Sequence, residues 1–192
     1  MRGKLLVALA LAGAMAGGRG FAQTSTWMID PEHSMVKFNI THLEVGHVDG
    51  TFLGVKGEVK FNEQDITKST VTATIDTSTV KTGSPTRDMD LRGQDFFHLG
   101  KFLDMTFTST SLTRVNGKLQ MTGELTLVGV TKTVTLDVEG PVGTQISEGK
   151  TICGFAASGT ISRKDFDFGQ KYGPAMIGDA VKFELRVQLD KN

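Results

Sequence analysis

The chain has 192 residues, of which 21 are basic and 21 acidic, so its formal net charge at pH 7 is zero. Such a balance argues against nucleic acid and against an anionic membrane surface as the main partner. The single cysteine, Cys153, excludes an internal disulfide.

Residues 1–22 have the pattern of a secretory signal peptide. Two basic residues precede an apolar run of 12 residues, and small residues follow it. The run is too short for a stable membrane span. We expect cleavage after Ala22, with Ala16 as the second choice, which leaves a single domain over 23–192 with a net charge of −3. The mature protein is then exported without stable membrane insertion, and it is periplasmic if the source is Gram-negative.

Most of the mature chain alternates apolar and polar residues with a period of two, which indicates β-strands. After an opening segment at 27–30, the strands are expected at 33–42, 45–52, 55–61, 71–75, 105–112, 119–127, 134–138, 152–161 and 179–190. Gly140-Pro141 should close the strand at 134–138. A sheet of this size must close or be covered. The pattern therefore predicts an all-β, eight-stranded antiparallel up-and-down barrel, which can hold one small ligand.

One stretch, near residues 84–97, interrupts the strands with a short helical pattern. Ser84 is a suitable N-cap, and Pro85 then occupies the first helical position, where its missing N–H costs nothing. Gly93 is a plausible terminator. A lone capped helix among strands suggests a plug or lid on the barrel.

Side chains of this segment can either hold the helix in place or contact a ligand. Asp88 and Arg92 are spaced for a pair on the helix face. Phe96 and Phe97 are large apolar anchors. Arg87 either braces the helix against the strands or meets a polar ligand head, and we place bracing first.

Small residues on the inward faces leave the state of the interior open. They either create a cavity or mark bulges and barrel corners. The positions concerned are Gly57, Ala73, Ser109, Gly123 and Ala157.

Catalytic and metal chemistry have weak support. His42, Glu44 and His47 form the only metal-like cluster, but histidines five apart do not share a strand face. Ser34 follows His33 without a nucleophile elbow or an orienting acid. We expect no catalytic residue, no metal site and no cofactor, and we favour a binding protein over an enzyme.

An ordered set of motifs spans the mature chain. It comprises Trp27-x-Ile29-Asp30-Pro31-x-His33-Ser34, Val48-x-Gly50-x-Phe52, Arg87-Asp88, Leu91-Arg92, Asp95-Phe96-Phe97, Gly123-x-Leu125-Thr126, Arg163, Phe168-Gly169 and Ile177-Gly178-Asp179. Together these motifs resemble the YceI-like family of lipid-binding barrels. The chain departs from the family pattern at Asp90, where a histidine is usual, and at Leu103, where proline is usual.

The resemblance implies an extended lipocalin-like barrel whose hydrophobic channel takes a long amphiphile, such as a polyisoprenoid, an isoprenoid quinone or a fatty amide. It also implies export to the periplasm and a possible homodimer. With the alternation, it predicts these ligand-binding residues: Phe38, Ile40, Phe52, Val59, Ile75, Arg87, Leu91, Phe96, Phe97, Met105, Phe107, Leu125 and Phe183.

Two other functions remain open on the sequence. The first is a lipid-modifying enzyme that uses His33, Ser34 or Arg87. The second is an interaction module whose barrel is a packed core and whose partner is a membrane redox or stress-response protein.

Overall fold

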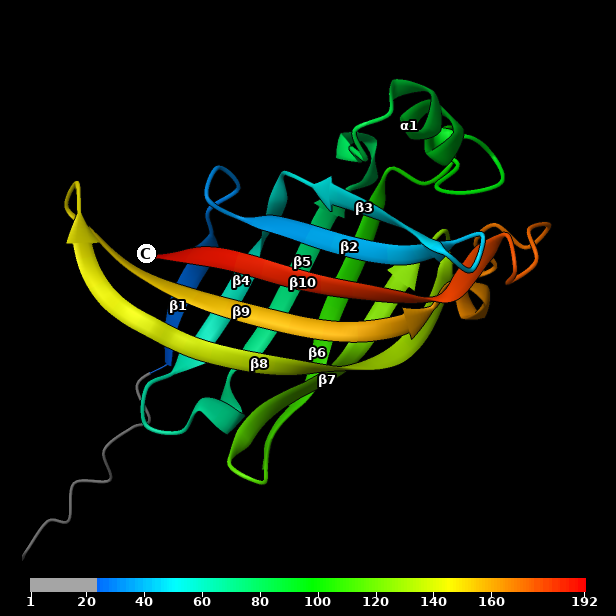
Figure 1. Ribbon diagram of the computed structural model, residues 1–192. Helices are drawn as coiled ribbons and strands as arrows, with labels where there is room; N and C mark the ends of the chain where they lie inside the picture. Colours follow the sequence, from blue (N-terminus) through cyan, green and yellow to red (C-terminus); the bar gives the residue numbers. More distant parts are fainter. Residues whose placement is uncertain (1–23) are drawn as a thin grey trace, which may run out of the picture.

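The computed structural model describes residues 24–192, which form an antiparallel barrel flanked by one helix (Figure 1). The predicted signal peptide lies outside the described residues. The strands are β1 Thr24–Ile29, β2 Met35–His42, β3 Gly46–Phe52, β4 Val55–Asn62, β5 Thr70–Asp76, β6 Asp104–Val115, β7 Lys118–Leu127, β8 Val130–Ser147, β9 Lys150–Ser162 and β10 Ile177–Lys191. The helix α1 is Pro85–Arg92, and the short 3₁₀ turns are η1 Ile66–Lys68, η2 Thr77–Thr79 and η3 Arg163–Phe166.

Eight strands close the barrel, as the sequence predicts. Their order is β1-β4-β5-β6-β7-β8-β9-β10, and β10 returns to β1 through pairs such as Met28 with Asp190. Closure pairs the strand edges that an open sheet would leave exposed.

The other two strands, β2 and β3, form a hairpin that extends the barrel wall. The long strand β10 pairs with β1 near its C-terminal end and with β2 over the remainder, for example Phe183 with Phe38. The hairpin therefore lies beyond β10 on the wall, and Thr51 of β3 bridges to Lys81, ahead of α1.

The expected end of a strand at Gly140-Pro141 is wrong, because β8 continues to Ser147. The register of β8 against β9 shifts between Glu139 and Val142. Pro141 therefore falls where the ladder is already broken, and its missing N–H removes no ladder hydrogen bond.

The helix has the caps that its sequence predicts. The Ser84 hydroxyl accepts from the Arg87 amide, Pro85 begins the helix, and the Gly93 amide donates to the Asp90 carbonyl. The expected pair between Asp88 and Arg92 is wrong, since each has partners in the segment before the helix.

Those partners tie α1 to the chain that leads into it. The Asp88 carboxylate accepts from the amide and hydroxyl of Thr82 at 2.8 and 2.6 Å. The Arg92 guanidinium donates to the carbonyls of Ser78 and Val80 at 3.1 and 2.9 Å. Hydrogen bonds to backbone groups that are already fixed require less ordering of side chains than an exposed ion pair on the helix face. Asp88 and Arg92 therefore bond to the preceding segment rather than to each other.

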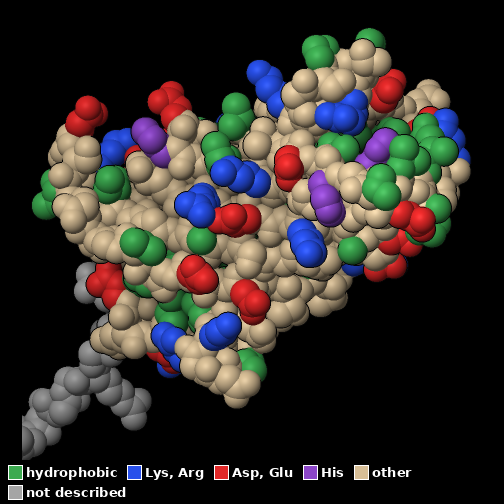
Figure 2. All heavy atoms as spheres, in the orientation of Figure 1, with side chains coloured by type: hydrophobic (Ala, Val, Ile, Leu, Met, Phe, Trp, Pro, Cys, Tyr) green, Lys and Arg blue, Asp and Glu red, His purple; other side chains and the backbone are tan. Residues whose placement is uncertain are grey.

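No helix within residues 24–192 is long and apolar enough to cross a membrane. On the face in Figure 2, basic and acidic side chains are interspersed over the strands, so the charges do not form a patch of one sign there.

Candidate functional site

The barrel encloses a cavity of about 520 Å³ that is lined mainly by apolar side chains. It extends from Leu189, which is buried, to Asp90 and Met176, which are exposed, and we call this exposed end the mouth. The packed-barrel alternative requires a filled interior, and this cavity contradicts it.

All of the predicted ligand-binding residues line this cavity. They are Phe38, Ile40, Phe52, Val59, Ile75, Arg87, Leu91, Phe96, Phe97, Met105, Phe107, Leu125 and Phe183. The nine residues on strands are placed by the period of two, which turns alternate side chains of each strand inward. Arg87 and Leu91 come from α1, and Phe96 and Phe97 from the segment that follows it. Their contact with a ligand stays a prediction.

Aromatic rings cluster at the mouth. Phe96 stacks on Tyr172 with ring centroids 5.3 Å apart and an interplanar angle of 11°. Phe97 meets Phe168 and Phe52 edge to face at 4.7 and 5.4 Å. The segment after α1 is thereby joined both to the loop after η3 and to β3, so three separate stretches of chain shape the mouth.

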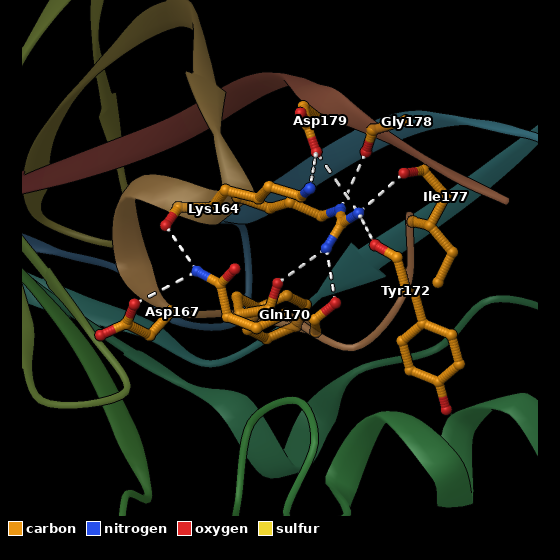
Figure 3. Close-up of polar contacts among 10 residues, drawn as sticks. Lys164, Asp167, Gln170, Tyr172, Ile177, Gly178 and Asp179 are labelled. Carbon is orange, nitrogen blue, oxygen red and sulfur yellow. Dashed lines mark hydrogen bonds and ion pairs between the residues drawn. The ribbon is translucent and has the colours of Figure 1, made fainter. Parts of the chain in front are cut away.

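Arg163 holds the loop after η3 in place from the inside (Figure 3). Its side chain is 1% exposed, and its guanidinium donates to five backbone carbonyls at 2.7–3.0 Å. The acceptors are the carbonyls of Phe168, Gly169, Tyr172, Ile177 and Gly178. A guanidinium has five N–H donors, so Arg163 has none left for a ligand.

The charge of Arg163 has one carboxylate partner. An Asp179 oxygen lies 3.3 Å from Nη2 and 4.0 Å from the Lys164 ammonium. Figure 3 shows Asp179 and Gly178 beside Ile177, above the loop that carries Tyr172. A buried cation needs such compensation, and here most of it comes from carbonyl dipoles.

Arg87 keeps part of its guanidinium available at the mouth. Its Nε and Nη2 both donate at 2.8 Å to Thr82, to the hydroxyl and to the carbonyl respectively. Within residues 24–192 no protein group accepts from Nη1. Arg87 thus braces the loop before its own helix rather than the strands, and it lines the cavity beside Asp90.

Of the small inward residues, Gly57 is required because the backbone of the neighbouring strand leaves no room for a side chain. It has φ of +157°, and a side-chain carbon there would overlap the Thr72 carbonyl of the neighbouring strand. Gly123 likewise lies against the Thr108 carbonyl, and also under the Phe107 ring. Gly57 is needed by the backbone although β4 stays in unbroken register with β5. The bulge interpretation fits Gly123, which pairs with Ser109 beside the register shift of β6 against β7 and also makes room for a ring.

Within residues 24–192, the titratable groups away from the mouth form no catalytic cluster or metal site. His33 Nδ1 lies 2.7 Å from the Asp30 carboxylate, which raises the pKa of His33 and lowers that of Asp30. The Ser34 hydroxyl accepts from the Gln188 amide instead of meeting His33. In the described part of the chain, no three His, Cys, Asp or Glu side chains gather as a metal site would require.

Sequence reasoning missed several residues at the mouth. His42, Tyr172 and Met176 line the cavity, as does Arg163, which entered only through the family motifs. Tyr172 and Met176 lie in irregular chain without alternation, so no periodic signal could place them. Val181 and Leu185 share a strand face with Phe183, and that phase alone could have added them.

A family model for the YceI-like domain matches residues 27–189. The protein YceI of Salmonella newport (strain SL254) is 39% identical over 158 residues, which cover 81% of this chain and 83% of that protein. The protein YceI of Salmonella arizonae has the same identity and coverage.

Solved structures have the same fold. The Campylobacter jejuni YceI protein is 31% identical, with a TM-score of 0.70 over 79% of this chain and 90% of that one. A polyisoprenoid-binding domain from Saccharophagus degradans is 15% identical, with a TM-score of 0.63 over 88% of this chain and all of that domain, and this likeness shows the fold alone. The family model spans nearly the whole described chain, so the protein belongs to the family with a YceI-like domain.

Proposed function

We propose that the protein binds one long-chain amphiphilic lipid in the barrel and carries or sequesters it in the periplasm. The observation that supports this function is the form of the cavity, which is apolar along the barrel and has ionisable side chains only near the mouth. A single tail with one polar head fits that distribution. The family, and a polyisoprenoid-binding domain with this fold, make an isoprenoid tail the first choice.

The size of the hydrophobic contribution is sufficient. Each buried CH₂ contributes about 0.8 kcal/mol, so a five-carbon isoprene unit contributes on the order of 4 kcal/mol. Three units give about 12 kcal/mol before the cost of ordering protein and ligand, which is at least ~4 kcal/mol. Affinity should therefore increase with tail length.

The polar head would lie between Arg87 and Asp90. Arg87 offers Nη1 as a donor, and the exposed Asp90 carboxylate is an acceptor at the position where relatives usually have histidine. A carboxylate only accepts hydrogen bonds, so it favours a head group that donates them. A neutral histidine has one donor and one acceptor nitrogen, so it can donate a hydrogen bond to the head group or accept one from it. We therefore propose that the head group differs from that of histidine-containing relatives.

The direct test is organic extraction and mass spectrometry of the freshly purified, exported protein. We expect a long-chain lipid in about one copy per chain, and uptake of such lipids by the delipidated protein in native mass spectrometry. A protein that is empty on purification and takes up no long-chain lipid would refute the proposal.

The head-group proposal is tested separately with Asp90→His. Native protein and variant are offered the same tail with an alcohol, an amide or a quinone head. We expect the order of preference to change while the tail-length dependence stays. The same head-group preference in both proteins would contradict the role of Asp90.

A further inference from the structure

Four neighbouring strands place two phenylalanines between two glycines in one row across the barrel wall. Gly159 of β9 pairs with Phe183 of β10, Phe183 pairs with Phe38 of β2, and Phe38 pairs with Gly50 of β3. Directly paired residues point to the same face of a sheet. Both rings therefore point into the cavity that they line.

The two rings lie over the glycines on either side of them. A methyl group on Gly50 would overlap the ring of Phe38, and one on Gly159 would lie 2.8 Å from Cζ of Phe183. Each ring thus leans away from the other and lies along the wall. Both phenylalanines are only half-buried although they face inward, because the cavity between the rings leaves part of each ring accessible.

The backbone does not require these glycines. Neither Gly50 nor Gly159 has a positive φ, and both lie in unbroken register with their partner strands. The three atoms nearest to an added methyl belong to side chains, namely Phe38 at Gly50 and Phe183 with Leu136 at Gly159. Gly57 and Gly123 differ, since an added methyl there meets a carbonyl of the adjacent strand.

We propose that Gly50 and Gly159 set the width of the cavity by giving Phe38 and Phe183 a place against the wall, and that this width admits a methyl-branched tail. The row lies midway along β10, between Ile177 at the mouth and Leu189 at the deep end. A tail that reaches the deep end must therefore pass the two rings. The inference rests on the proposed lipid-binding function and assigns its specificity for the tail.

The test is a competition between two alcohols whose main chains have the same number of carbons. Delipidated protein is offered geranylgeraniol, which has methyl branches, together with an equal amount of hexadecanol, which has none. The ratio of the two bound species is read by native mass spectrometry. One methylene in an apolar pocket changes discrimination by about 10- to 200-fold.

In Gly50→Ala and in Gly159→Ala we expect the bound ratio to shift toward hexadecanol by about ten-fold, near the lower end of that range. Gly100→Ala is the matched control, since a methyl group at Gly100 meets nothing within 4 Å. Adding Phe38→Leu to Gly50→Ala should restore the native ratio, because the smaller side chain leaves the centre of the cavity free. Phe38→Leu alone should favour geranylgeraniol.

Native ratios in both alanine variants, with native circular dichroism spectra, would overturn the inference. A shift of the bound ratio in Gly50→Ala that Phe38→Leu does not reverse would also overturn it. If the native protein takes neither alcohol, the proposed function fails, and crystal structures of the two alanine variants still decide the inference. Rings displaced into the cavity support it, and rings left in place contradict it.

Discussion

Replacing Arg163 by methionine should destabilise the protein and loosen the mouth. The substitution keeps a long apolar stem but removes all five donors, three to carbonyls of the loop after η3 and two to carbonyls at the start of β10. An unsatisfied buried acceptor costs about 1–3 kcal/mol, although the five costs do not add, because the loop after η3 can open and let water reach the carbonyls. We expect a loss of about 3–5 kcal/mol, as when one partner of a buried ionic pair is removed.

The assay is urea denaturation of Arg163→Met, followed by far-UV circular dichroism. For a domain of this size, the loss corresponds to a fall in melting temperature of about 10 °C. Tyr172 is the only tyrosine in the chain and its ring stacks on Phe96. The difference between near-UV circular dichroism spectra with and without Tyr172→Phe cancels the signal of Trp27 and reports the mouth separately. We expect the tyrosine signal to weaken.

Two variants serve as comparisons. Arg163→Lys retains the charge with only three donors and should lie between the native protein and Arg163→Met. Arg114→Met makes the same chemical change at an exposed position of β6 and should have little effect. A loss below about 1 kcal/mol in Arg163→Met, with an unchanged tyrosine signal, would refute the role we assign to the five hydrogen bonds.

Three further predictions concern other parts of the chain. Asp88→Asn should lower stability by about 1–2 kcal/mol in urea denaturation, because it weakens charge-assisted bonds from Thr82 to a buried carboxylate, and an unchanged midpoint would contradict this. Burial raises the pKa of the Cys153 thiol to about 11, so iodoacetamide at pH 8 should modify it only in denaturant, and rapid labelling of the folded protein, detected by mass spectrometry, would be the contrary result. The raised pKa of His33 contributes stability that is present below its ordinary value of 6.5 and lost as pH rises through the folded value. The lowered pKa of Asp30 contributes stability present above its ordinary value of 3.8 and lost as pH falls through the folded value. Melting temperatures should therefore decline slightly from pH 6 to pH 8 in the native protein and not in His33→Gln, and equal slopes would exclude the pair as the cause.

Local chemistry made the helix and most strands predictable. Ser84, Pro85 and Gly93 act as caps through their own side chains or backbone geometry, so no distant residue is needed to identify them. The exception at Gly140-Pro141 shows the limit of this reasoning. Whether a proline ends a strand depends on whether the partner strand leaves that position unpaired, and the partner β9 follows later in the chain.

The pairing of side chains depended on partners that spacing does not reveal. Asp88 and Arg92 have the right separation for a helix pair, but Thr82, Ser78 and Val80 offer better partners once the preceding segment folds back on the helix. Arg163 is similar, since its five acceptors come from a loop and from β10 that only the fold brings around one guanidinium.

The sequence by itself determined which side chains face the interior, because the two-residue period of a strand is a local property. The predicted ligand-binding residues of the strands consequently line the cavity, whereas Arg87, Leu91, Phe96 and Phe97 reach it from α1 and the segment after it. Only the tertiary structure decided that the interior is hollow, because that depends on the register between strands. In this register Phe38 and Phe183 adjoin Gly50 and Gly159, so the rings can lie along the wall and leave the centre open.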